Sequence, residues 1–422
     1  MKLELPYGRG ALGVELPDDI HVLLPSRSTA LTVPEEAVRL ALRRPLNSSP
    51  LRDLLSPRDG VAVVISDITR PVPNRVLLPP LLETIAAAGV PRERVVIING
   101  TGMHRANTRE ELASMLGEDV VREYRIVNHD ARDRSTLARV GVDGENFWLN
   151  REYLESGVKV LTGFVEPHIF AGYSGGGKAV LPGLAGAETI LKNHGFDMLS
   201  HPRATWCCAE GNPIFEQVRR VALATGPAFI VNVTLNERKE ITGVFAGELA
   251  AAHDAAIAQA AAQALTTIPH LYDVVVATNM GWPADINLYQ SMKAMSVAAQ
   301  AVRPGGAIVL AAECAEGLGN DDFSRLLTSE RSFPALMEKI RRSGFAADEQ
   351  WGVQCIAMVA EKADVYVHSC LPREVIEGQA HLRHSEDVTE TVRWLLRAKN
   401  GGRKPSVAAL PHGQLTVPRL QR

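Results

Sequence analysis

Apolar and polar positions follow a repeating order along the chain: a short run rich in Val and Ile, then a longer segment with helical spacing. Runs of this kind, bounded by polar residues, predict strands that are buried on both faces. Helical patterns cover 76–89, 108–116 and the alanine-rich segment 247–265. The predicted strands are 61–67, 94–100, 124–130, 158–165, 228–236, 272–279, 306–313 and 364–369.

Strands that alternate with helices predict an α/β fold with parallel-rich sheets. The stretch "TTIPHLYD" after the alanine-rich helix is a plausible boundary. We therefore expect one α/β domain at 1–268 and a second at 269–400. The tail, 401–422, could add a strand to the second domain or return to the first. In parallel sheets, ligands bind beyond the carboxyl ends of the strands.

Composition excludes several classes of protein. Apolar content is 46% and charged content is 22%, as in an ordinary globular chain. The net charge is −3, so the chain lacks the surplus of basic residues that is typical of proteins that bind nucleic acids or membrane surfaces. No apolar run is long enough to suggest a membrane span, and the first residues lack the apolar core of a signal peptide. The five cysteines have no metal-ligand spacing, so we expect a reducing, cytoplasmic setting. The oligomeric state is not decided by these features.

Two polar motifs directly follow predicted strands. In "SDITRPVP" (66–73), Asp67 and Arg70 either form a local ion pair or present a guanidinium to a carboxylate or phosphate. In "INGTGMHRANT" (98–108), His104 follows a flexible glycine turn. It is either a solvated side chain or, because it lies past a strand end, an acid/base group.

The stretch "FAGYSGGGKAVLPG" (170–183) is close to the phosphate-binding pattern G-x-x-x-x-G-K-[ST]. Ala179 stands where a Mg²⁺-binding hydroxyl is needed, which disfavours triphosphate hydrolysis. The glycines could still point N–H groups at an anion. Lys178 is either a solvated loop lysine or, if buried, an amine suited to covalent attachment. His168 and His194 flank it without the spacing of a zinc site.

A fourth block, "MGWPADINLYQSMKAMSVAAQ" (280–300), follows the first strand of the second predicted domain. Asp285 or Asn287 could cap a helix here. Tyr289, Gln290 and Lys293 would then fall on one side of its first turns, either solvated or facing a ligand.

Together the four blocks resemble the nickel-pincer lactate racemase family over most of the chain. The resemblance depends on D-x-T-R-P (67–71), N-G-x-x-x-H (99–104), H-x-x-A-G-[FY]-S-G-G-x-K (168–178), P-G-x-A-G (182–186), N-H (193–194) and L-Y-Q-x-x-K (288–293). It implies two α/β domains with the active site in the cleft between them. It also implies an isomerase, a racemase or epimerase of lactate or a related 2-hydroxy acid.

The resemblance further implies a nickel complex of pyridinium-3-thioamide-5-thiocarboxylic acid mononucleotide, made by separate cofactor-biosynthesis enzymes and joined covalently to Lys178. Such a cofactor would take the substrate's hydride while a base removes the hydroxyl proton, which avoids a dianion and gives a 2-keto acid. His104 and His168 would be the two acid/base groups, and His194 the nickel ligand. The implied substrate contacts are Arg70, Tyr289, Gln290, Lys293 and Trp351; the implied cofactor contacts are Asp67, Thr69, Ser174, Gly175 and Gly176.

One position departs from the family's common form: Gly177 stands where a basic residue often precedes the tether lysine, which leaves the substrate open. Two alternatives also stay open. One is a kinase or nucleotide hydrolase that uses the 172–178 loop, and the other is a nickel or cofactor carrier without turnover.

Overall fold

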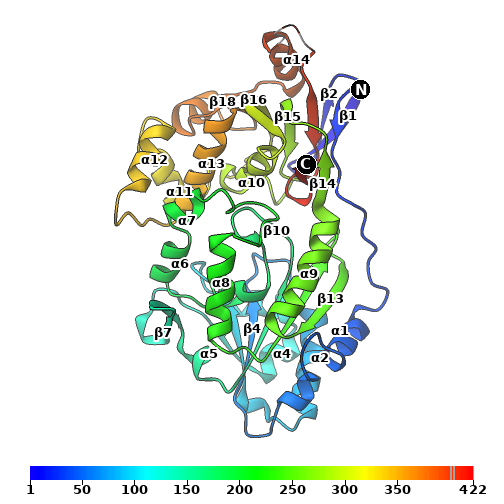
Figure 1. Ribbon diagram of the computed structural model, residues 1–422, viewed down its shortest axis with the longest axis vertical. Coiled ribbons are helices and arrows are strands. Elements are labelled where there is room, and N and C mark those ends of the chain that lie inside the picture. Colours follow the sequence, from blue (N-terminus) through cyan, green and yellow to red (C-terminus); the bar gives the residue numbers. More distant parts are fainter. Residues whose placement is uncertain (400–401, 403, 422) are drawn as a thin grey trace. The chain divides into compact units, whose positions relative to one another are not determined.

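The computed structural model describes residues 1–399, 402 and 404–421, and the chain forms two compact units (Figure 1). The first-sheet unit holds residues 27–193 and 202–263. The second-sheet unit holds residues 1–26, 194–201 and the described residues from 264 onward. The predicted α/β class is confirmed in both units.

The first-sheet unit is built on six strands in the order β13-β12-β9-β4-β5-β6. All neighbours pair in parallel except β13, which runs antiparallel at one edge. The five parallel strands confirm the first five predicted ones. The nearly unbroken burial of β4, β5, β9 and β12 explains their continuous apolar runs, whereas β6 at the edge is only partly buried. The bounds are β4 (Val61–Ser66), β5 (Val95–Gly100), β6 (Arg125–Asn128), β9 (Val158–Phe164), β12 (Phe229–Leu235) and β13 (Ile241–Gly247).

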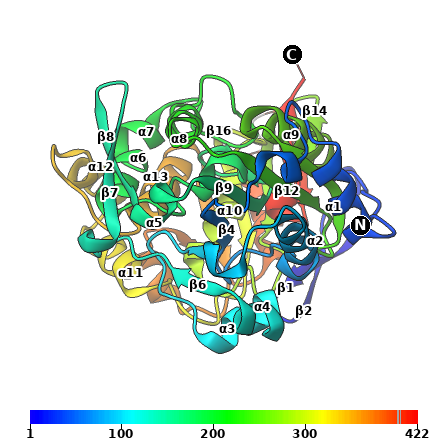
Figure 2. The same cartoon turned by 90° about the horizontal axis from the view of Figure 1, so that it is seen from below.

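Helices cover both faces of this sheet. Alternate residues of β4, among them Val61 and Val63, share one core with α1 and α2, which lie side by side (Figures 1 and 2). Ala62 and Val64 are buried on the other face. The helices of the unit are α1 (Pro34–Arg43), α2 (Asn74–Ala87), α3 (Arg109–Leu116), α4 (Glu118–Glu123), α5 (Arg151–Glu155), α6 (Ala187–Asn193), α8 (Pro213–Ala224) and α9 (Leu249–Ala264).

Among the hairpins that were not anticipated from the hydrophobic pattern, two lie outside the main sheet of this unit. One joins β7 (Leu137–Val142) to β8 (Glu145–Asn150) through Asp143-Gly144, both with positive φ (50° and 83°). Asp-Gly between two strands is a strong hairpin signal, so the sequence did contain this one. The other joins β10 (Pro167–His168) to β11 (Gly172–Tyr173) and is too short to leave a pattern.

The second-sheet unit is built on six strands in the order β18-β17-β16-β15-β19-β3, and every pairing is parallel. It confirms the strands predicted at 272–279, 306–313 and 364–369. The bounds are β3 (His21–Val22), β15 (Tyr272–Thr278), β16 (Val302–Ala311), β17 (Asp364–His368), β18 (Arg383–His384) and β19 (Val407–Leu410), with β14 (Leu265–Ile268) and β20 (Val417–Leu420) paired separately. The helices are α7 (Phe196–Ser200), α10 (Leu288–Ala298), α11 (Asp321–Leu327), α12 (Phe333–Arg341), α13 (Gln350–Lys362) and α14 (Val388–Ala398).

The two units are not continuous stretches of chain, unlike the predicted division at residue 268. Strand β3 of the N-terminal segment pairs with β19 from the tail, and β19 pairs with β15. The tail therefore adds strand β19 to the second sheet, while residues 401, 403 and 422 lie outside the described residues. Long-range pairing of this kind leaves no local signal.

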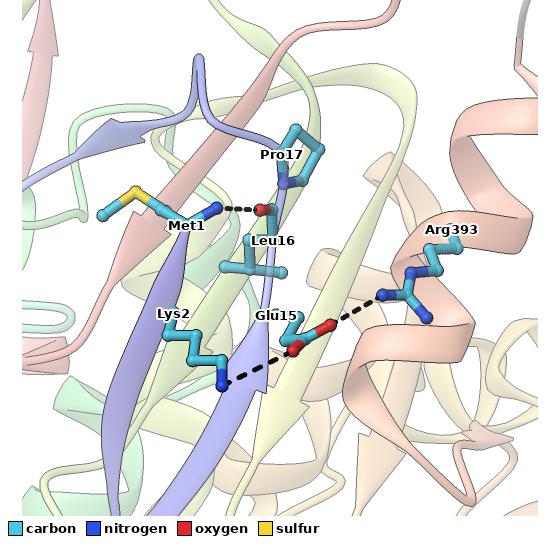
Figure 3. A pocket seen from close by; sticks show the side chains of 6 residues that line it. All are labelled: Met1, Lys2, Glu15, Leu16, Pro17 and Arg393. Carbon is cyan, nitrogen blue, oxygen red and sulfur yellow. Dashed lines mark hydrogen bonds and ion pairs between the residues drawn. The ribbon is translucent and has the colours of Figure 1, made fainter.

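The N-terminal hairpin of β1 (Lys2–Tyr7) and β2 (Gly10–Glu15) also belongs to the second-sheet unit. Figure 3 shows how it is tied to α14: the Arg393 guanidinium lies 2.9 Å from a carboxylate oxygen of Glu15. A small hollow of about 320 Å³ opens beside this contact, and none of the predicted site residues lines it. No helix among the described residues has the length and apolar character needed to span a membrane.

Candidate active site

The predicted site residues fall into two sets, one in each unit. We call the first the strand-end set, because its members lie beyond the carboxyl ends of β4, β5 and β9: Asp67, Arg70, His104, His168 and Lys178. We call the second the helix set, because its members lie on or against α10 and α13: Tyr289, Gln290, Lys293, Trp351 and His194. Strand β4 lies between β5 and β9, so the strand-end set comes from three adjacent strands.

Asp67 and His104 form a hydrogen-bonded pair. His104 Nδ1 lies 2.6 Å from Asp67 Oδ2, and the Asp67 side chain is buried while that of His104 is 48% exposed. A carboxylate only accepts hydrogen bonds, so the neutral imidazole carries its proton on Nδ1 and leaves Nε2 as an open acceptor. The sequence placed both residues past strand ends, and it left open whether Asp67 forms an ion pair with Arg70.

The surroundings of Asp67 favour its charged form. Burial by itself raises the pKa of this carboxyl, but hydrogen bonds from His104 and Thr69 and the charges of His104 and Arg70 outweigh it and lower the pKa. Thr69 donates its hydroxyl to Asp67 Oδ1 at 2.6 Å. Predicted as a cofactor contact, Thr69 thus also holds the carboxylate that orients His104.

A buried asparagine fixes the two loops that bear this pair. Asn107 Oδ1 accepts the N–H of Ile68 at 3.2 Å and the side-chain amide of Asn99 at 2.9 Å. It therefore links the loop after β4 to the end of β5. The sequence analysis did not single out Asn107, because an asparagine near a turn has many ordinary uses.

His168 and Lys178 lie together on the other side of β4. Lys178 Nζ is 3.3 Å from His168 Nε2. His168 Nδ1 accepts the backbone N–H groups of Phe170 and Ala171, at 3.2 and 3.1 Å. Since Nδ1 accepts, the neutral ring carries its proton on Nε2, the nitrogen that faces the lysine amine. His104 and His168 are thus held in opposite tautomers.

Lys178 is not a solvated loop lysine. Burial and the nearby charge of Arg70 lower its pKa to about 7. A substantial fraction of the amine is therefore neutral near neutral pH, and only the neutral form is a nucleophile. This environment fits covalent attachment.

The glycine-rich loop differs from the phosphate cradle that its sequence suggested. Gly176 donates its N–H to Asn232 Oδ1 at 2.7 Å, and Lys178 donates its N–H to the Gly175 carbonyl at 3.1 Å. Ser174 donates its hydroxyl to the Phe164 carbonyl at 3.0 Å. These groups are occupied within the protein. The predicted cofactor contacts of Ser174, Gly175 and Gly176 stay predictions.

A short 3₁₀ turn, η4 (Gly176–Ala179), follows the loop where a phosphate loop requires a full helix. Gly177 is part of this turn, and a Cβ there would lie 2.9 Å from the Val218 carbonyl oxygen and 3.0 Å from Ala222 Cβ on α8. A side chain at 177 would thus point into α8. Packing accounts for the glycine that departs from the family's common form.

The helix set begins at the N-terminus of α10. Asn287, one of the two predicted caps, accepts the N–H of Gln290 at 2.9 Å. Asp285 instead accepts backbone N–H groups from Gly8 and Glu313. Lys293 donates to Gln290 Oε1 at 3.0 Å, so these two polar side chains meet on one side of the helix, as their spacing predicts.

Tyr289 and Trp351 are joined by a hydrogen bond. Trp351 Nε1 donates to the Tyr289 hydroxyl at 3.0 Å. The tyrosine side chain lies between Gly319 and Gly352. An added Cβ would come within 2.7 Å of the Tyr289 Cβ at Gly319 and within 2.8 Å of its ring at Gly352. The aromatic pair is therefore held in one arrangement by backbone packing.

His194 lies against the same helix as Trp351. The two rings meet edge to face with centroids 5.6 Å apart, and Gln350 donates its amide to the His194 carbonyl at 3.4 Å. His194 is buried, with 7% of its surface exposed. Gln350 is a supporting residue that the sequence analysis missed, since a glutamine early in a helix is usually solvated.

No group of three or more His, Cys, Asp and Glu side chains gathers as a metal site within the part of the chain that the structure describes. A nickel ion here would need donors from a bound cofactor in addition to a protein imidazole. One buried histidine and one low-pKa lysine are compatible with that requirement.

Comparison with known proteins identifies the family of the chain. Residues 7–207 match the lactate racemase N-terminal domain family, and residues 268–417 match the lactate racemase C-terminal domain family. The lactate racemase of Thermoanaerobacterium thermosaccharolyticum is 34% identical over 365 residues, 85% of each chain. That of Lactiplantibacillus plantarum is 33% identical over 328 residues, 76% of this chain and 77% of the relative.

Solved structures lead to the same family. The lactate racemase apoprotein from T. thermosaccharolyticum superposes with a TM-score of 0.92 and 31% identity, covering 99% of this chain and 100% of that one. A protein from Thermotoga maritima, at 18% identity and a TM-score of 0.68, shares the fold over 94% of this chain. With both domain families matched in order over most of its length, the chain belongs to the lactate racemase family and is an isomerase of the racemase type.

Proposed function

We propose that the protein racemises lactate or a closely related 2-hydroxy acid with the help of a nickel-pincer nucleotide attached to Lys178. The observation that carries the proposal is the lysine amine held next to His168, with the Asp67–His104 pair at the neighbouring strand ends. Both relatives named above are lactate racemases, which makes lactate the first substrate to test.

The residues present fit such a cofactor. Lys178 has the lowered pKa that a tether lysine needs, and His194 offers a buried imidazole for the metal. When bound, the group would supply a hydride acceptor for the hydrogen on the substrate's chiral carbon. Soft sulfur donors with one imidazole suit nickel better than they suit magnesium or calcium.

The protein's own residues would accept and donate the proton of the substrate's hydroxyl group. His104, with Nδ1–H held by Asp67, has Nε2 open to take the substrate's hydroxyl proton. Asp67 stabilises the imidazolium that results. His168 holds its proton on Nε2 and so is set to donate a hydrogen bond to the substrate oxygen. It becomes a base for the mirror-image substrate only when its proton moves from Nε2 to Nδ1, which then gives up its two backbone contacts.

Other residues would bind and orient the substrate. Arg70 and Lys293 are the cations available for the carboxylate, and the Arg70 guanidinium can hold it through two parallel hydrogen bonds. Gln290 accepts from Lys293 and keeps an amide N–H for the substrate oxygen. Tyr289 and Trp351 hold each other, so their role would be to fix the pocket wall.

A racemisation screen tests the proposal. The protein would be produced together with the cofactor-biosynthesis enzymes, incubated with single enantiomers of several 2-hydroxy acids, and assayed by chiral chromatography. We expect conversion of either lactate enantiomer to the racemate, and an intact mass that exceeds that of the bare chain. Nickel-loaded protein with the added mass that converts none of the acids would contradict the racemase assignment and favour a carrier.

A nucleotide hydrolase is the second candidate, and the structure weighs against it. Ala179 offers no hydroxyl for Mg²⁺, and the loop amides of Gly176 and Lys178 are already bonded. We expect no ATP or GTP hydrolysis above a buffer control. The cytoplasmic setting stays a prediction from the composition.

A further inference from the structure

His253 is a buried polar residue on the alanine-rich helix α9, and the function described above does not use it. Only 3% of its surface is exposed. Its Nε2 lies 2.9 Å from the carbonyl oxygen of Ser174, the residue that opens the glycine-rich loop. Its ring stacks on Phe215 at 5.6 Å between centroids, with an angle of 23° between the planes.

Two partners fix the tautomer of His253. Arg219 Nη2 lies 3.4 Å from Nδ1, and because a guanidinium has only donors, Nδ1 must accept. The Ser174 carbonyl only accepts, so Nε2 must donate. Arg219 is itself held by an ion pair with Asp254 and lies over the Phe215 ring, 4.7 Å from its centroid.

The charged groups around His253 keep it neutral. Its pKa is lowered to about 4, and burial is the largest cause. The charges of Arg219 on α8 and of Lys178 on η4 contribute to this lowering, while the hydrogen bond to Ser174 and the charge of Asp254 act against it. A neutral ring here adds no positive charge next to the lysine amine.

The glycine-rich loop packs directly against the His253 ring. Gly176 has a φ of +53°, and a Cβ on it would lie 2.2 Å from His253 Nδ1. On its other side the loop meets Asn232 of β12, which accepts the Gly176 N–H at 2.7 Å. The loop is thus clamped between β12 and α9, two residues before Lys178.

The geometry points to His253, with its tautomer set by Arg219, as a positioning residue that clamps the glycine-rich loop and so presents the Lys178 amine for cofactor attachment. This inference rests on the proposed function, in which Lys178 is the tether. The clamp reaches the amine through the backbone: Gly175 accepts the N–H of Lys178 at 3.1 Å, and Lys178 Nζ then lies 3.3 Å from His168 Nε2.

The test measures the Lys178 amine in protein made without the cofactor enzymes. Competitive labelling with isotopic acetic anhydride over a pH series, read by peptide mass spectrometry, gives the titration midpoint of each lysine. The neutral amine attacks a carbonyl carbon of the anhydride, the C–O bond to acetate breaks, and the amine's proton goes to solvent. For the wild-type protein we expect a Lys178 midpoint near 7.

Two variants of His253 separate the clamp from simple packing. His253→Leu removes the donor to Ser174, so the loop loosens and water reaches the amine. We expect the Lys178 midpoint to rise by about one pH unit and its labelling at pH 7 to fall about fivefold. His253→Gln keeps an N–H donor the same number of bonds from the backbone, and we expect it to restore most of the wild-type value.

A matched control and a second variant keep the inference open to refutation. His129 is also buried and lies 3.0 Å from a backbone carbonyl oxygen, that of Ala185, so His129→Gln should leave the Lys178 midpoint unchanged. Arg219→Met removes the donor to His253 Nδ1, and we expect a smaller rise of the midpoint. A wild-type midpoint in folded His253→Leu would overturn the inference. If His253→Leu does not fold, a wild-type Lys178 midpoint in Arg219→Met would overturn the inference.

The inference and the proposed function fail differently. Wild-type protein produced with the cofactor-biosynthesis enzymes should gain mass on the peptide that contains Lys178. If it does not, the tether assignment is wrong, while the labelling series still decides whether His253 controls the amine. If the mass is gained but His253→Leu labels like the wild type, only the role of His253 is wrong.

Discussion

The strand-end set and the helix set differ in the kinds of side chain they contain and in the contacts those side chains make. The strand-end set pairs each histidine with a group that can exchange or stabilise charge: Asp67 with His104, and Lys178 with His168. The helix set is joined by neutral amide, indole and hydroxyl groups, apart from Lys293, and its tyrosine is enclosed by two glycines. The first set is suited to moving protons, and the second to holding a fixed geometry.

The difference has a physical origin. Carboxyl ends of adjacent parallel strands bring several loops to one edge, so titratable side chains from distant parts of the sequence can meet there. Helix positions three or four residues apart, and the face of a neighbouring helix, give rigid spacing instead. Mutations should therefore affect proton transfer in the strand-end set and orientation in the helix set.

The largest effect should come from Lys178→Ala. Without the amine no covalent attachment is possible, so we expect no added mass and no racemisation after production with the cofactor-biosynthesis enzymes. Intact mass spectrometry and chiral chromatography measure both. Lys192→Ala is the matched control: this exposed lysine pairs with Glu145, and the variant should gain mass like the wild type. Turnover at the wild-type rate in Lys178→Ala would refute the tether.

Removing either member of the Asp67–His104 pair should come next. His104→Ala and Asp67→Asn should each lower kcat by about 10²- to 10⁴-fold with the cofactor mass retained, because the base is lost or left in the wrong tautomer. Arg105→Ala, at an exposed neighbour paired with Glu111, should keep the wild-type rate. Since His168 is held in the opposite tautomer, His168→Ala should slow the two enantiomers unequally relative to His104→Ala. A wild-type rate in either histidine variant would refute the two-base scheme.

A smaller effect is expected from the aromatic pair of the helix set. Trp351→Phe and Tyr289→Phe each remove the same hydrogen bond, worth about 1 kcal/mol, so each should lower kcat/KM by about fivefold to tenfold. The double variant should be no worse than either single one, because both changes break one contact. Trp394→Phe, at a half-exposed indole on α14, is the control. Additive losses would show that Tyr289 and Trp351 act separately.

A separate effect, on stability in acid and not on catalysis, is expected from His253. His253 has a folded pKa of about 4 against 6.5 for an ordinary histidine, so between these values the unfolded chain binds more protons. Stability is then fully present above pH 6.5 and is lost as the pH falls toward 4, by up to about 3 kcal/mol. Urea unfolding at several pH values should show a flatter curve for His253→Gln. His270 is exposed, so the stability of His270→Gln should vary with pH as that of the wild type does. A wild-type pH dependence in His253→Gln as well would show that His253 is charged in the folded protein.

Much of the fold could be predicted from the sequence because each buried parallel strand is a short apolar run. Strands β4 and β15 contain continuous apolar runs at 61–65 and 274–277, and a cap at Asp285 or Asn287 was expected before α10. The sequence did not predict that the second-sheet unit includes residues 1–26 and 194–201. Their membership depends on contacts such as β3 with β19, whose partners lie nearly four hundred residues apart and share no local pattern.

The site divides in the same way. The sequence supplied the residue types and their positions past strand ends, and the ordered motifs identified the family. Only the tertiary structure decided that Asp67 pairs with His104, that Gly177 faces α8, and that His253 in an alanine-rich helix reaches the glycine-rich loop. Hydrophobic periodicity is a local property that one chain segment can record. Hydrogen-bond partners, tautomers and amine pKa values depend on which distant segments fold against each other.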